Sequence, residues 1–156
     1  MGALRNPQVE PSLYDRDFYA WSQEMAERLR QRNAAALDWD NLAEEIQALA
    51  RSDHRQLFDR IEVLLIHLLK WSTRTGSRPK SWKNTIDEQR SRLEVLLQDN
   101  PSLAQLAPEA VAERYTRAAA RAAEQCGLPA DALPGRSPFT PDQVLDYNYL
   151  PAGLDG

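Results

Sequence analysis

The chain of 156 residues is poor in cysteine, histidine and glycine, with one, two and six of each. A single cysteine, Cys126, excludes an internal disulfide and leaves too few ligands for an ordinary structural zinc site. A reducing cytoplasm is therefore the compartment we expect. The longest apolar runs, such as Val63–Ile66, are far too short to span a membrane, and residues 1–11 lack the apolar core of a secretory signal.

Signatures of catalysis are missing as well. Neither His54 nor His67 has an acidic residue three positions earlier, so the Glu-x-x-His pattern of di-iron bundles is absent. The sequence also lacks a P-loop, a Gly-x-Gly-x-x-Gly and a Gly-x-Ser-x-Gly motif. We expect no metal and no cofactor, and we favour a non-enzymatic function.

What is present is helical periodicity. Composition, at 42% hydrophobic and 27% charged residues, is that of one globular domain, predicted over residues 12–151 between a tail at 1–11 and another at 152–156. Ser12 is a candidate helix N-cap. Apolar and aromatic residues then follow it at helical steps, as one stripe: Tyr14, Phe18, Trp21, Met25 and Leu29.

Between Leu37 and Thr75 the chain has neither glycine nor proline. This segment is either one long helix or two helices broken near Ser52–Asp53. Its first part has a predicted inner stripe of Trp39, Leu42, Ile46 and Leu49. Its second part carries an apolar arc too wide for a surface helix, which predicts a central helix contacted on more than one side.

Gly76 and Pro79 mark a turn, after which an amphipathic helix runs to Asn100–Pro101. The short turn predicts an antiparallel helical hairpin. A further helix begins near Pro108 and ends at Gly127, and half of the ten prolines lie between Pro129 and Pro151. We therefore predict an all-α bundle of four main helices with a long central helix and a proline-rich C-terminal wrap.

The end of this hairpin is the best candidate binding surface. Residues 70–92 hold seven Lys or Arg against two Asp or Glu, a net charge of +5 in a chain of net charge −4. Tryptophans flank the turn, and cations beside aromatic rings suit phosphate or single-stranded nucleic acid. The candidate residues for anion or partner binding are Lys70, Arg74, Arg78, Lys80, Trp82, Lys83 and Arg90. The alternative is that both tryptophans belong to the core and the cations form a solvated rim.

Acid–base candidates are few. Glu45 borders the apolar stripe beside Glu44, and a salt bridge to a neighbouring arginine is favoured over a catalytic role. His67 and Gln89 are expected on facing helices, where a structural hydrogen bond is favoured over a catalytic pair because a buried amide must find a partner.

Several motifs together resemble one family. They are Tyr14-x-x-Asp17-Phe18-x-x-Trp21, Leu42-x-Glu44-Glu45-Ile46, His67-Leu68-Leu69-Lys70-Trp71, Ser81-Trp82-x-x-Thr85-Ile86-x-x-Gln89-Arg90, Pro101-Ser102-Leu103 and Pro138-Phe139-Thr140. Over residues 13–151 the chain resembles the bacterial family known as domain of unknown function twenty-nine. The resemblance implies an all-helical bacterial protein and assigns no role to any motif residue.

The favoured function is a cytoplasmic binding or protein-interaction module that uses the basic hairpin end. Its partner is a protein or a second copy of the chain, with nucleic acid less well supported and a membrane not expected. One alternative is an enzyme acting on a phosphate-bearing or nucleic-acid substrate, with Glu45, His67 and Gln89 as its acid–base candidates. The other is a structural homodimer subunit with no small-molecule site.

Overall fold

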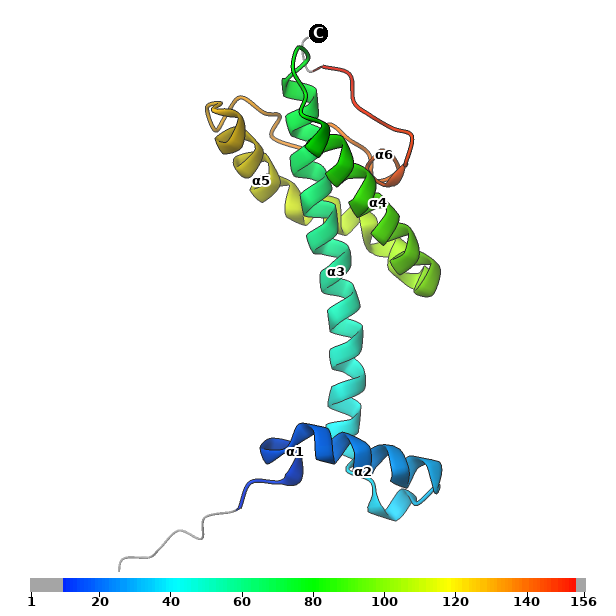
Figure 1. Ribbon diagram of the computed structural model, residues 1–156. Coiled ribbons are helices and arrows are strands. Elements are labelled where there is room, and N and C mark those ends of the chain that lie inside the picture. Colours follow the sequence, from blue (N-terminus) through cyan, green and yellow to red (C-terminus); the bar gives the residue numbers. More distant parts are fainter. Residues whose placement is uncertain (1–9, 154–156) are drawn as a thin grey trace, which may run out of the picture. The chain divides into compact units, whose positions relative to one another are not determined.

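The computed structural model describes residues 10–153, which contain helices and no strand (Figure 1). The predicted all-α class and the four main helices are confirmed. The predicted tails at 1–11 and 152–156 lie mostly outside the described residues. The elements are α1 (Leu13–Arg16), α2 (Phe18–Arg30), the 3-10 helix η1 (Ala34–Ala36), α3 (Trp39–Thr73), α4 (Lys80–Asp99), the 3-10 helix η2 (Pro101–Leu106), α5 (Ala107–Cys126) and α6 (Pro141–Leu145).

The chain forms two compact units, Met1–Ala50 and Arg51–Gly156. The long helix α3 crosses the boundary between them without a break, which decides for one helix over two. The prediction of a single domain over residues 12–151 stays a prediction. Within the described part of the chain, no helix has the length and apolar content needed to cross a membrane.

The first unit is built around Trp21. Ser12 caps α1, but Asp17 accepts a hydrogen bond from the backbone N–H of Ala20 and begins a new helix, so the expected continuous helix is split. The Trp21 Nε1 donates to Asp38 at 3.1 Å, which links α2 to the start of α3. Trp21 and Met25 are buried by these contacts.

The expected inner stripe at the start of α3 is wrong. Trp39, Ile46 and Leu49 are 61%, 67% and 70% exposed, and on α2 Phe18 and Leu29 are about half exposed. Periodicity correctly groups these residues on helix faces, but within the first unit α2 covers only part of the apolar surface that the two helices present.

The second half of α3 forms the core of the second unit. Its side chains are buried around much of the helix circumference, as the width of the apolar arc predicts. The fully buried ones include Leu57, Phe58, Ile61, Leu64, Leu65, Leu68 and Leu69. Ile86 and Leu93 of α4 and Tyr115 of α5 join the same cluster.

Helix α4 runs antiparallel to α3, which confirms the predicted hairpin. Residues late in α3 contact residues early in α4, since Lys70 lies over the ring of Trp82, whereas Arg60 in the middle of α3 bonds Gln89 further along α4. Helix α5 instead runs parallel to α3 (Figure 1). Glu62 contacts Arg114, and Lys70, later in α3, contacts Gln125, later in α5.

A buried carboxylate joins α3 to α5. Glu62 is 4% exposed and accepts hydrogen bonds from Arg114 at 2.9 Å and from Nε of Arg117 at 2.8 Å, with Arg121 3.7 Å away. Several arginines around one buried carboxylate offset its desolvation cost. Hydrogen bonding from Arg117, then from Arg114, holds the pKa of Glu62 below its usual value.

The C-terminal segment packs on the bundle, as predicted for the proline-rich wrap. Gly127 ends α5 in the left-handed conformation, with φ of 66°, which a glycine adopts without steric cost. Phe139 and Val144 then enter the core, and α6 begins with a capping box between Thr140 and Gln143.

Leu65→Asp should abolish the cooperative unfolding transition of the protein. Leu65 is fully buried, and an unpaired charge there costs several kcal/mol. Val95→Asp is the matched control, because Val95 is 56% exposed and its replacement should change stability by less than about 0.5 kcal/mol. Equal thermal melts for the two variants would contradict this description of the core.

Glu62→Gln should lower the free energy of unfolding by about 3 kcal/mol at pH 7, the cost of breaking a buried ion pair. A lowered pKa in the folded state means that the stabilisation is full above the usual carboxyl pKa and is lost as pH falls through the lowered value. Urea titrations at pH 7 and pH 3 should therefore show a smaller difference between wild type and variant at pH 3. A difference in unfolding free energy between wild type and variant that is the same at both pH values would contradict the lowered pKa of Glu62.

Candidate functional site

At the hairpin end, cations lie over both tryptophan rings. The Arg78 guanidinium lies 4.6 Å from the centroid of the Trp71 ring. Lys70 Nζ and the Arg74 guanidinium lie 4.8 Å and 5.9 Å from the centroid of Trp82. Since Trp71 and Trp82 are both half-buried, these cation–π contacts join the turn to the two helices.

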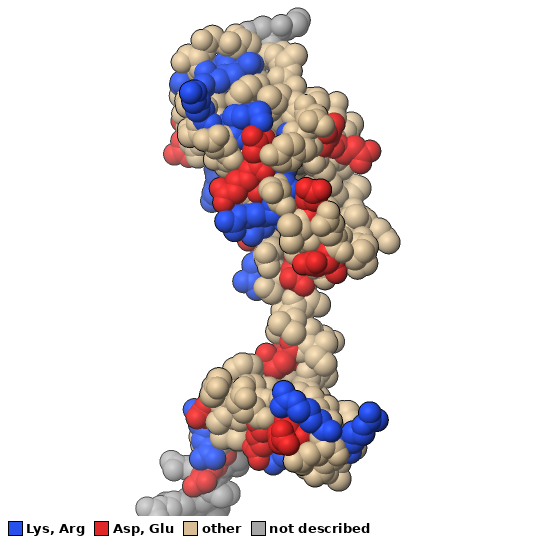
Figure 2. All heavy atoms as spheres, turned by 45° about the vertical axis from the view of Figure 1, so that its right-hand side comes forward, with Lys and Arg blue, Asp and Glu red and all other residues tan. Residues whose placement is uncertain are grey.

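Several predicted anion-binding cations are engaged within the chain. Lys70 is 8% exposed and donates to Gln125 Oε1 at 2.8 Å, because a buried ammonium needs an acceptor. Lys83 donates to both carboxylate oxygens of Asp87 at 2.6 Å. Arg74 and Lys80 are exposed. Figure 2 shows basic atoms gathered on the end of the second unit that holds this turn.

Arg90 has a structural role rather than the predicted anion-binding one. It is 2% exposed, and its guanidinium donates to the carbonyls of Gln143, Val144 and Tyr149 at 3.0, 2.9 and 2.6 Å. The planar fork of an arginine suits three acceptors at once. Burial lowers the pKa of Arg90 from its ordinary value. Arg90 thus fastens the C-terminal segment to α4.

Each acid–base candidate has a hydrogen-bond partner within the chain, and for Glu45 the partner is a tyrosine and not the expected arginine. Glu45 accepts a hydrogen bond from the Tyr14 hydroxyl at 2.5 Å, a bond that raises the pKa of Tyr14 to about 12. His67 Nδ1 lies 2.9 Å from the Val63 carbonyl, and burial lowers the pKa of His67. Gln89 joins α4 to α3, as expected for a structural amide, but its partner is Arg60 and not His67.

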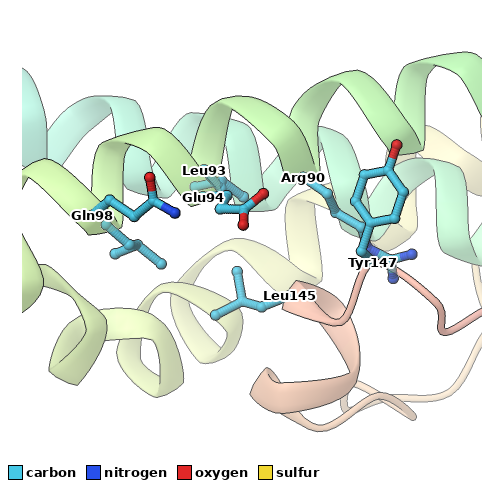
Figure 3. A pocket seen from close by; sticks show the side chains of 7 residues that line it. Arg90, Leu93, Glu94, Gln98, Leu145 and Tyr147 are labelled. Carbon is cyan, nitrogen blue, oxygen red and sulfur yellow. The ribbon is translucent and has the colours of Figure 1, made fainter.

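A pocket of about 430 Å³ lies between α4 and the end of α6, together with the residues that follow α6. Figure 3 shows Glu94 and Gln98 of α4 on one side and Leu145 opposite, with Tyr147 beside Arg90. Because the Arg90 donors already bind carbonyls, the pocket presents the Glu94 carboxylate beside apolar side chains. Over residues 10–153, no group of three or more His, Cys, Asp or Glu side chains is placed to hold a metal ion.

The first unit holds a surface that the sequence reasoning placed in the core. We define the apolar face as Phe18, Trp21, Met25, Leu29, Leu42, Ile46 and Leu49, which line a groove of about 270 Å³ between α2 and the start of α3. Glu45 supplies a charge among the described lining residues, and it is bonded to Tyr14. The signal for this surface was in the sequence, since two facing stripes on only two helices leave apolar surface uncovered.

The fold and these surfaces define an all-α helical protein of which one unit exposes a groove suited to apolar groups. Residues 13–150 match the family model described as Domain of unknown function DUF29. Since the match covers most of the chain, the chain belongs to this family, and the resemblance seen in its motifs is confirmed. No curated protein and no solved structure matches the chain.

Arg90→Lys should loosen the C-terminal segment, because one ammonium cannot reproduce the three hydrogen bonds that the guanidinium donates. We expect faster proteolytic cleavage within residues 141–153 and a loss of about 2–4 kcal/mol in unfolding free energy.

The matched control is Arg92→Lys, since Arg92 is exposed and pairs with Glu88 at 2.8 Å. Equal cleavage rates for the two lysine variants would contradict the role given to Arg90.

Proposed function

We propose that the chain is a protein-interaction module, and that its binding surface is the apolar face of the first unit. The class of function is the one favoured from the sequence, but the surface differs. We further propose a bacterial cytoplasmic location. The motif resemblance supports a bacterial source, and the single, partly exposed cysteine suits a reducing compartment.

The observation that carries the proposal is the exposure of large aliphatic side chains beside a groove. Ile46 and Leu49 are 67% and 70% exposed on adjacent turns of α3, and Leu29 of α2 is 49% exposed. Burying one such side chain fully is worth about 1.5–3 kcal/mol. Contiguous apolar surface of this kind marks protein-binding sites more often than scattered single residues do.

The hairpin end supports binding less well. Lys70 and Arg90 are buried and hydrogen-bonded, and Lys83 is paired with Asp87. Arg74 and Lys80 are the exposed cations nearest the turn, which is a small basis for binding a polyanion. The enzyme alternative has less support still, because Glu45, His67 and Gln89 each hold a bond that serves the fold.

A photo-crosslinking amino acid at position 46 tests the proposal in living cells. A benzophenone side chain replacing Ile46 should form adducts between the full chain and another polypeptide, identified by mass spectrometry. The same group at position 95 is the matched control, since Val95 is an exposed aliphatic residue of α4 outside the apolar face. Adduct yield at position 46 should clearly exceed that at position 95, because only position 46 lies within the proposed contact surface.

Introducing Leu49→Glu into the position-46 protein should abolish its adducts, and Lys80→Glu with Lys83→Glu should leave them intact. Crosslinks confined to one chain, or equal yields at positions 46 and 95, would contradict the proposal. If the adducts were lost in the Lys80→Glu, Lys83→Glu variant and kept in the Leu49→Glu variant, the binding surface would be the hairpin end.

A further inference from the structure

We infer that the occupant of the apolar face is the same face of a second copy of this chain, so that two first units form a four-helix bundle. This inference rests on the proposed function and names its partner. The first unit contributes two helices, α2 and the Trp39–Ala50 part of α3. Two helices cannot enclose a core between them, whereas two such pairs can bury all their apolar stripes together.

The pattern on α3 fits helix-to-helix packing. Trp39, Leu42, Ile46 and Leu49 follow at steps of three, four and three, which is the spacing of a coiled-coil seam. Ala43 and Ala50 flank this seam and are exposed. Small residues beside a seam allow a neighbouring helix to approach closely, so the apolar face has the shape of a helix-packing surface.

The charges of the first unit favour a second copy of the same chain as the binding partner. The walls of the groove are almost wholly apolar, with Glu45 occupied by Tyr14, so the groove offers little to a strongly charged peptide. The two ends of α2 have opposite but small net charges. Residues 15–17, at its start, carry −1, and residues 24–32, at its end, carry +1, because Glu24 and Glu27 pair with two of the three arginines there.

A two-fold axis perpendicular to α2 relates the two copies of this helix in antiparallel directions. The acidic start of α2 in one copy then lies beside the basic end of α2 in the other, and the helix dipoles oppose favourably. In this arrangement, each end of α2 lies beside an end of opposite charge in the other copy. The face is thus complementary to itself in hydrophobicity and in charge, as an isologous interface requires.

Sedimentation velocity and light scattering on the purified full chain test the inference. We expect a species of twice the 17.7 kDa chain mass that dissociates on dilution. Ile46→Glu should weaken the dimer by about thirtyfold or more, the usual effect of losing a central contact residue. Helix content and the buried core of the second unit should be retained in that variant. Val95→Glu, the matched control, should remain dimeric.

A charge swap tests the antiparallel arrangement. Arg30→Glu alone and Asp15→Arg alone should each weaken the dimer, and the two together should restore it, because each changed end meets the other changed end across the axis. Failure of the double variant to recover would overturn this arrangement.

The outcomes separate this inference from the proposed function. A monomer at every concentration, with position-46 adducts to a different protein in cells, would overturn the second copy as partner and keep the interaction module. A monomer that forms no adducts would overturn both. A dimer that survives both Ile46→Glu and Leu49→Glu would place its interface elsewhere and overturn the inference.

Discussion

The structure depends on the unequal burial of α3, a single helix of 35 residues. In the second unit, its side chains from Leu57 to Leu69 are packed by α4, α5 and the C-terminal segment. In the first unit, the Trp39–Leu49 part of α3 packs against α2, but its large aliphatic side chains remain exposed to solvent. An isolated stretch of helix gains little stability from its backbone alone, so this part of α3 needs contacts that the first unit does not supply.

Polar interactions fix how the second unit is assembled around that helix. Glu62 joins α3 to α5 through arginines, and Arg90 joins α4 to the C-terminal segment through three carbonyls. Both groups are nearly fully buried, and each is satisfied by several partners, as buried charges require. Because the hydrogen bonds of these charged groups are made within the fold, their charge is a poor guide to ligand binding.

Sequence periodicity predicted the fold because helices and turns are local. The absence of Gly and Pro between Leu37 and Thr75 predicted a long helical segment, and the turn at Gly76 and the stop at Gly127 predicted where helices end. The candidate site was less predictable. Arg90 and Glu62 bond residues more than fifty positions away, which no local pattern reveals. Likewise, a stripe such as Ile46 and Leu49 looks the same whether its own chain or a partner covers it.

Amide hydrogen exchange across α3, followed by mass spectrometry at two protein concentrations, tests the central claim most directly. The claim is that the start of α3 is completed by another polypeptide, whereas its second half is completed by its own chain. We predict that protection of Leu57–Leu69 is high and independent of concentration, and that protection of Trp39–Ala50 rises as the concentration is raised. Equal, concentration-independent protection of both segments would contradict the account.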